Sequence, residues 1–262
     1  MPDIRNTMSG HKSLLELPLL TESYSALIER FLQLGYEVRN SSHFNPSQRH
    51  LLLRHDVDLD LGAALEMAQM ESQLGLKSTF FILVTCPFYN ALVDSNVKII
   101  RQIIKLGHNI GVHVDLQGIS NMEEMRTRIE AEALILSNIS ESTVESFTFH
   151  RPGMLKSMEK VSSFQVSGFS NFYEPRLCGH SAYVSDSRGG WYHGHPLEAS
   201  AVIQGKGIQL LTHPIWWGNI AQRCRTAVDV LCNFQEQNRR SIDSLLKSEF
   251  KIISSVGCNE ID

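Results

Sequence analysis

Apolar residues in the first half of the chain repeat one pattern, in which a stretch with helical spacing is followed by a glycine and then by an apolar or β-rich run. Apolar side chains three and four positions apart mark the helical stretches, which cover residues 24–34, 61–74 and 97–106. Each stretch ends at a glycine, the residue that most readily takes the left-handed conformation after a helix: Gly35, Gly75 and Gly107. The repetition predicts alternating helices and strands around a parallel sheet.

Strands covered on both faces read as continuous apolar or β-rich runs. The predicted strands occupy residues 36–38, 51–53, 78–84, 109–114, 146–149 and 208–213. Helical spacing predicts a further helix over 123–137 and a closing helix over 221–246. Between them, residues 170–191 predict a long loop region with short strands. Residues 1–20 predict an irregular lead-in, and a tail runs from the closing helix to residue 262. Because no linker or low-complexity segment interrupts the pattern, we expect one domain over residues 1–262.

Composition and charge narrow the class of protein without changing this architecture. Hydrophobic residues make up 42% of the chain and charged residues 20%, which is ordinary for a globular protein. A net charge of −4 and the absence of a basic run argue against a nucleic-acid partner. The N-terminus has no apolar leader segment and no stretch of 18 apolar residues occurs, so we expect a cytoplasmic protein without a membrane span. The five scattered cysteines form no Cys-x-x-Cys pair and suggest neither a disulfide framework nor a thiolate metal site.

Two acids, Asp56 and Asp58, directly follow the first continuous apolar run. Side chains alternate faces along a strand, so these carboxylates point the same way with Cα atoms about 7 Å apart. One interpretation is a metal ligand beside a catalytic base, and the other is a pair of solvated loop acids that cap the next helix. The other strand ends decide between them.

Polar side chains also end three other predicted strands. His113 and Asp115 end one, His150 and Arg151 follow a second, and His213 follows a third. In parallel α/β barrels the carboxyl ends of the strands converge on one face, which carries the active site. This convergence favours a functional site over chance placement.

Five segments resemble, in order and approximate spacing, the motifs of the polysaccharide deacetylase (NodB-homology) family, the carbohydrate esterases of family four. The segments are residues 54–58, 107–113, 149–152, 185–187 with Trp191, and 210–213. The resemblance runs from about Leu51 to Pro214, which is most of the chain. It implies a single distorted, incomplete (β/α) barrel of about seven strands and metal-dependent hydrolysis of N- or O-acetyl groups on sugars. Zinc is the usual metal of the family.

Carried over by order, the resemblance implies that Asp56 is the general base and that Asp58 binds the metal, although the valine between them leaves the opposite assignment open. The family's second motif has two metal-binding histidines four residues apart; His113 matches the first, but Gln117 stands at the second. Asp115 shares a strand face with His113, so the predicted ligands are Asp58, His113 and Asp115. Such nitrogen and oxygen ligands suit one divalent ion, zinc or else manganese, nickel or cobalt.

The remaining motifs supply supporting residues. Arg151 resembles the arginine that orients the base, although His150 takes this place in another alignment register. Asp186 resembles the acid that supports this arginine, and Trp191 resembles the tryptophan that forms a wall of the pocket. His213 resembles the general acid.

Three further residues near the last motifs leave alternatives open. His195, in a turn-rich stretch, is either solvated or a replacement metal ligand. Trp216 and Trp217 follow the last motif. They are expected either to form a surface on which a sugar stacks or to be part of the core.

We therefore expect a metal-dependent deacetylase acting on an acetylated sugar of a surface-polysaccharide or related glycan pathway. Gln117 motivates one alternative, a barrel that has lost its hydrolytic activity and acts as a sugar-binding or regulatory module. A metal hydrolase of a non-sugar amide is the other. The sequence gives no indication of the oligomeric state.

Overall fold

The computed structural model describes residues 20, 22–154, 158–179 and 182–250, except for the side chains of 158–160. Residues 1–19 of the predicted lead-in and the predicted tail beyond residue 250 lie outside the described residues. No helix in the described part of the chain is both long enough and apolar enough to cross a membrane.

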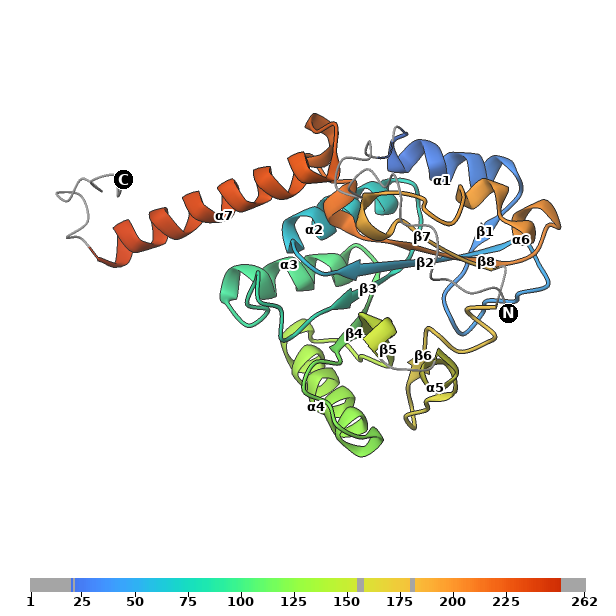
Figure 1. The fold of residues 1–262 in the computed structure, drawn as a ribbon, viewed down its shortest axis with the longest axis horizontal. Helices are drawn as coiled ribbons and strands as arrows, with labels where there is room; N and C mark the ends of the chain where they lie inside the picture. The colour runs from blue at the N-terminus through green and yellow to red at the C-terminus, as the bar shows by residue number, and fades with distance from the viewer. Residues whose placement is uncertain (1–19, 21, 155–157, 180–181, 251–262) are drawn as a thin grey trace, which may run out of the picture.

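Parallel strands form one curled sheet around β2 (Figure 1). Seven of them follow the order β6-β5-β4-β3-β2-β8-β7, and β1 pairs with the start of β2. Every pairing is parallel. The strands are β1 (Glu37–Val38), β2 (His50–Val57), β3 (Thr79–Ile82), β4 (Asn109–Asp115), β5 (Ser146–His150), β6 (Ser170–Asn171), β7 (Tyr183–Ser185) and β8 (Ile208–Thr212). The predicted distorted, incomplete (β/α) barrel is confirmed.

Most of the helices follow the predicted pattern. The helices are α1 (Tyr24–Gln33), α2 (Leu61–Gln73), α3 (Asp94–Lys105), α4 (Met122–Ser140), α5 (Met158–Ser163), α6 (Ser200–Ile203) and α7 (Ala227–Glu249). Short 3-10 turns occur at Pro152–Met154, Ser187–Gly189, Pro196–Glu198, Pro214–Trp216 and Ala221–Arg223. The glycines predicted to stop α1, α2 and α3 all have positive φ, at 79°, 71° and 96°.

The closing helix begins later than its apolar spacing predicts. Residues 221–223 form a separate 3-10 turn, and α7 starts at Ala227. Its start is fixed by a capping box, in which the Thr226 hydroxyl accepts from the backbone of Asp229 while the Asp229 carboxylate accepts from the backbone of Thr226. Figure 1 shows α7 extending away from the sheet, and Ile242 and Leu245 on its distal half are exposed.

Side chains of β2 alternate between two apolar clusters. Leu51 and Leu53 belong to the main core between the sheet and the helices. Leu52 belongs to a smaller cluster inside the curl. Because alternate residues share a face, Arg54 and Asp56 point into the curl together with Leu52. The polar groups of the site therefore rise from the interior of the incomplete barrel.

The outer face of β2 carries a buried polar network centred on Glu71 of α2. Its Oε1 lies 3.0 Å from Nε2 of His55 and also accepts from the Tyr24 hydroxyl, while its Oε2 accepts from the Ser78 hydroxyl at 2.6 Å. His108, just before β4, has Nδ1 3.0 Å from the Ser78 hydroxyl and Nε2 2.9 Å from the carbonyl oxygen of Ala68 in α2, so it belongs to this network and does not line the site cavity. These bonds tie α1 and α2 to the strands that carry the site.

Side chains at the two edges of the sheet approach each other. The rings of Tyr173, just after β6, and Tyr183, on β7, have centroids 6.2 Å apart. The guanidinium carbon of Arg54 lies 4.5 Å from the Tyr173 ring centroid. Aromatic contacts thus close the interior where the strands themselves do not pair, and the carboxyl ends of the strands surround one cavity.

Candidate metal and catalytic site

A cavity of about 610 Å³ lies at the carboxyl ends of the strands. Its polar lining comes from β2, β4, β5 and β7 and from the segments that follow β2, β5, β6, β7 and β8. The charged and titratable side chains on its wall are Asp56, Asp58, His113, His150, Arg151, Arg188 and His213, with tyrosines 173 and 183. The structure therefore brings together at one cavity the strand-end residues that the sequence singled out, except Asp115.

Asp58, His113 and His150 form a group that could hold a metal ion. One ligand atom from each lies within 4.8 Å of the others. Oδ1 of Asp58 is 3.0 Å from Nε2 of His113 and 3.3 Å from Nδ1 of His150. Although buried, this oxygen has no hydrogen bond of acceptable geometry to any described residue. A buried carboxylate oxygen between two imidazole nitrogens is an arrangement that a divalent cation would satisfy.

The surroundings of His113 support this fit. Its Nδ1 lies 2.7 Å from Oγ1 of Thr148, the residue opposite it on β5. A hydrogen bond between Nδ1 and Thr148 orients the ring and leaves Nε2, which faces Asp58, as the nitrogen that could bind a metal ion, as in many histidine metal ligands. Burial alone would raise the pKa of Asp58, but the imidazoles of His113 and His150 hold it well below its usual range. The group therefore presents one carboxylate and two imidazoles as ligands.

Asp115, the expected third ligand, is not part of this group. Its Oδ1 accepts a hydrogen bond from the backbone N–H of Gln117 at 3.0 Å, so the side chain caps the loop after β4. The structure brings His150 to the place that we had assigned to Asp115. His195, the other alternative, pairs instead with Glu22.

Asp56 is held by Arg54, two residues earlier on the same strand. Nε of Arg54 donates to Oδ1 at 2.9 Å and Nη2 donates to Oδ2 at 2.7 Å, a bidentate ion pair. The Arg54 side chain is fully buried, and it also donates to the Tyr173 hydroxyl at 3.1 Å and to Gln209 at 3.3 Å. Burial opposes ionisation of Asp56, yet Arg54 and the nearby His113 lower its pKa below the ordinary value.

Arg151, which we expected to orient Asp56, lies elsewhere on the cavity wall. It follows β5 in a left-handed conformation with φ 53°, and its exposed guanidinium has no hydrogen bond or ion pair with another described residue. The arginine that contacts Asp56 is Arg54 instead. Sequence reasoning missed it although the signal was present, because residues i and i+2 of a strand share a face.

His213 is held by Asp186. Nδ1 of His213 lies 2.6 Å from Oδ1 of Asp186, and the backbone N–H of His213 donates to both carboxylate oxygens at 3.0 Å. Oδ2 of Asp186 also accepts from Nε1 of Trp217 at 2.6 Å. Burial disfavours the charged imidazole, but Asp186, followed by Asp58 and Asp56, raises the pKa of His213 to about 9. Asp186 thus contacts the histidine, whereas we had expected it to support an arginine.

The three tryptophans predicted to bind substrate occupy different places. Trp216 lines the cavity. Trp217 is buried and donates its indole N–H to Asp186. Trp191 packs against Trp217 with ring centroids 6.0 Å apart and does not line the cavity. Among the three, the structure places Trp216 where it can touch a molecule in the site.

Comparisons with known proteins find likenesses only among solved structures. No protein-family model and no curated protein sequence matches the chain. The chain is similar to a pseudoenzyme of carbohydrate esterase family four from Bacillus anthracis, at 15% identity over 74% of this chain and 64% of that chain, with a TM-score of 0.41. It is similar to a family-four carbohydrate esterase from the same organism, at 11% identity over 90% of this chain and 100% of that chain, with a TM-score of 0.42.

A third structure is a family-four acetyl xylan esterase from Clostridium thermocellum in complex with a cobalt ion, at 19% identity over 63% of this chain and 73% of that chain, with a TM-score of 0.38. This chain spans about two thirds of the length of the pseudoenzyme. All three TM-scores lie below 0.5, so the function proposed below rests on the side chains of the site.

Proposed function

We propose that the chain is a divergent member of the polysaccharide deacetylase family, a metal-dependent hydrolase that removes an acetyl group from a sugar. One observation carries the proposal. An ionised carboxylate held by an arginine and a protonated imidazole held by a carboxylate both border the same group of metal-type ligands. Nε2 of His113 lies 3.7 Å from Oδ2 of Asp56, and Nε2 of His213 lies 3.8 Å from Oδ2 of Asp58.

Asp58, His113 and His150 would hold the ion, which we propose is zinc. When bound, such an ion supplies Lewis-acid chemistry by drawing charge from the acetyl carbonyl oxygen. The ligand set of one carboxylate and two imidazoles takes the place of the family's acid and paired histidines. On this proposal, Gln117 does not imply loss of the metal, because His150 supplies the second imidazole from β5.

Asp56 and His213 move the protons. Asp56, kept ionised by Arg54, accepts a proton from the attacking water. His213 donates a proton from Nε2 to the leaving nitrogen or oxygen as its bond to the acetyl carbon breaks, so the products are acetate and the free amine or hydroxyl. Asp186 holds Nδ1 of His213 and thereby turns Nε2 toward the cavity. Arg54 and Asp186 are positioning residues for the base and the acid.

The proposal includes a sugar of a surface-polysaccharide or related glycan pathway as the substrate and the cytoplasm as the place of reaction. Trp216 would form an apolar wall for the sugar ring. A barrel that binds sugars without hydrolysing them would keep this wall and the metal ligands, but would release no acetate.

Acetate release from N-acetylated and O-acetylated sugars tests the proposal. The wild-type protein should release acetate, and a chelator should abolish the reaction until zinc is restored. Asp56→Asn and His213→Ala should each lower kcat by about 10²- to 10⁴-fold, the usual contribution of a general base or acid. Asp94→Asn, at an exposed position on α3, is the matched control and should keep the wild-type rate. Wild-type rates in both site variants would contradict the assignment.

A further inference from the structure

Two arginines line the site cavity in a backbone conformation that side chains rarely adopt. Arg151 follows β5 with φ 53°, and Arg188 lies in the turn after β7 with φ 60°. Glu141 is the third non-glycine residue with positive φ in the described part of the chain, so two of these three residues are arginines on one cavity wall. Such strain persists where the surrounding structure holds it and is concentrated at functional sites.

Neither guanidinium has a counter-charge among the residues that the structure describes. Both side chains are exposed, and neither makes a hydrogen bond or ion pair with another described residue. The acidic residues on the same cavity wall are Asp56 and Asp58. Asp56 is paired with Arg54, and Asp58 lies between the two imidazoles of the metal group. Two positive charges at this cavity therefore remain available to a ligand.

The sheet order brings these arginines to the cavity from two strands that lie far apart along the sheet but near each other where the curl closes. β5 and β7 stand near opposite ends of the strand order, and the contact between Tyr173 and Tyr183 brings those two edges together. The cavity, at about 610 Å³, is within the range of small-molecule sites and has room for a sugar with an attached group. Guanidinium groups match the oxygen geometry of phosphate and often bind it through two hydrogen bonds.

We propose that the substrate carries a phosphate group, which Arg151 and Arg188 bind while the acetyl group lies between Asp56 and His213. Two guanidinium charges match a phosphate ester or diphosphate better than a single carboxylate. This inference rests on the proposed function for the reaction, but the binding of the phosphate is testable without turnover. A sugar nucleotide and a lipid-linked sugar diphosphate share the required chemistry.

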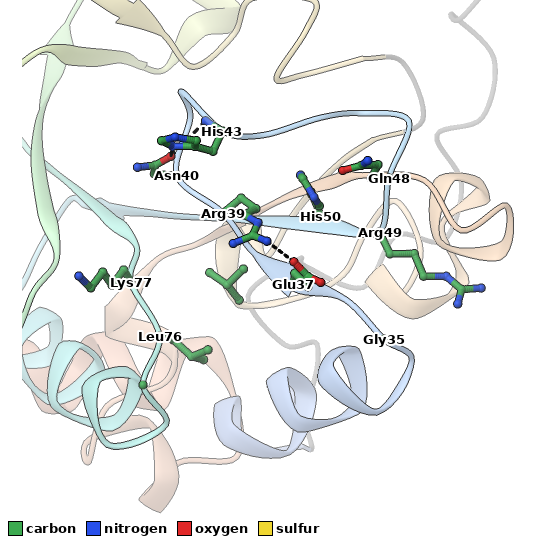
Figure 2. Close-up of a pocket in the computed structure, with 12 residues that line it drawn as sticks. Gly35, Glu37, Arg39, Asn40, His43, Gln48, Arg49, His50, Leu76 and Lys77 are labelled. Atoms are coloured by element: carbon green, nitrogen blue, oxygen red, sulfur yellow. Dashed lines mark hydrogen bonds and ion pairs between the residues drawn. The ribbon is translucent and has the colours of Figure 1, made fainter.

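A second hollow in the molecule is also cationic and must be distinguished from this one. It lies at the amino ends of β2 and β3, and Figure 2 shows Arg39, Arg49 and Lys77 on its wall. Arg39 pairs there with Glu37 (Figure 2). Because this hollow lies at the opposite end of the strands, a variant in it serves as the matched control for anion binding.

Calorimetric titration of the zinc-loaded protein with glucosamine 1-phosphate, which carries the phosphate but has no acetyl group to be removed, measures the binding step. Arg151→Asn and Arg188→Asn remove the charge with a residue that tolerates positive φ, so each variant should fold. Each should weaken binding by about 10- to 100-fold, as expected for loss of a charged hydrogen bond, and Arg49→Asn should leave it unchanged. Lysine at either position should restore part of the affinity. Unchanged affinity in both site variants, or loss of affinity in Arg49→Asn alone, would overturn the inference.

Acetate release from four probes then shows which kind of phosphate-bearing sugar the protein prefers. The probes are N-acetylglucosamine, its 1-phosphate, UDP-N-acetylglucosamine and a polyprenyl-diphosphate-linked N-acetylglucosamine. The wild-type kcat/KM should favour a phosphorylated probe over the neutral sugar by about tenfold or more, and the Arg151 and Arg188 variants should lose this ratio. Equal kcat/KM for neutral and phosphorylated probes would overturn the inference and leave the deacetylase proposal standing. No acetate from any probe would contradict the deacetylase proposal, and the titration would still decide the phosphate site.

Discussion

Replacing Arg54 with methionine should remove the positive charge that Asp56 needs while keeping most of the buried volume. The Arg54 side chain is 0% exposed and that of Asp56 is 3% exposed, so water cannot take over the lost contacts. The variant loses both hydrogen bonds of the bidentate pair and leaves the Asp56 carboxylate unpaired in the interior. Breaking a buried pair in this way costs about 3–5 kcal/mol of folding free energy.

The same change should reverse the way in which the contribution of Asp56 to folding stability depends on pH. In the wild type, the pKa of Asp56 is lowered, so its contribution to stability is present above the unfolded pKa of about 3.9 and is lost as the pH falls through the folded pKa. Without Arg54, burial raises this pKa. A cost of about 3–5 kcal/mol corresponds to a change of roughly 2–4 pH units. Arg54→Met should then be less destabilised at pH 5 than at pH 8.

Urea unfolding followed by circular dichroism, at pH 5 and pH 8, measures both effects. Arg151→Asn is the matched control and should change stability by no more than about 0.5 kcal/mol, because its side chain is exposed and unpaired among the described residues. The double variant Arg54→Met with Asp56→Asn should cost less than the sum of the two single changes. Equal losses in the Arg54 and Arg151 variants, or a loss from Arg54→Met that is the same at both pH values, would refute the reasoning.

Three other variants test separate parts of the structure. Asp186→Asn should lower the pKa of His213 from about 9 toward its ordinary value of about 6.5. The loss of kcat/KM at alkaline pH should therefore begin at a lower pH than in the wild type, and an unchanged pH–rate profile would contradict the role of this pair. Burial raises the pKa of Glu132 to about 7, so the wild type should lose about 1–3 kcal/mol of stability as the pH rises from about 4.5 to 7; Glu132→Gln should abolish this loss in urea unfolding. Gly111→Ala would drive Cβ into the ring of Phe81 on β3 and should destabilise by about 1–3 kcal/mol in the same assay, whereas Gly153→Ala, with open space around it, should not.

The fold was predictable because its signals are local. Helical spacing, terminal glycines and continuous apolar strands are properties of neighbouring residues, and they gave the alternation of α1, α2 and α3 with the strands. The shared face of Asp56 and Asp58 follows from alternation along one strand. The predicted start of α7 was wrong because the apolar spacing continues into the 3-10 turn at Ala221–Arg223, whereas the hydrogen bonds of Thr226 set the start of the helix.

The composition of the site was less predictable because it depends on contacts between strands. His150 reaches Asp58 from β5, and the register that pairs Asp115 with His150 across β4 and β5 is not readable from either segment alone. Asp115 was chosen from its face on β4, but its carboxylate turns back to the backbone of Gln117. The single-domain organisation stays a prediction.

Titration of the metal-free protein with zinc tests the central claim most directly, using wild-type, His150→Ala and Asp115→Ala proteins. We expect the wild type to bind one zinc ion per chain. His150→Ala should lose more than about a hundredfold in affinity, because removing a ligand costs more than removing a residue that only orients one. Asp115→Ala should bind like the wild type. Wild-type affinity in His150→Ala together with loss of affinity in Asp115→Ala would contradict the site described above.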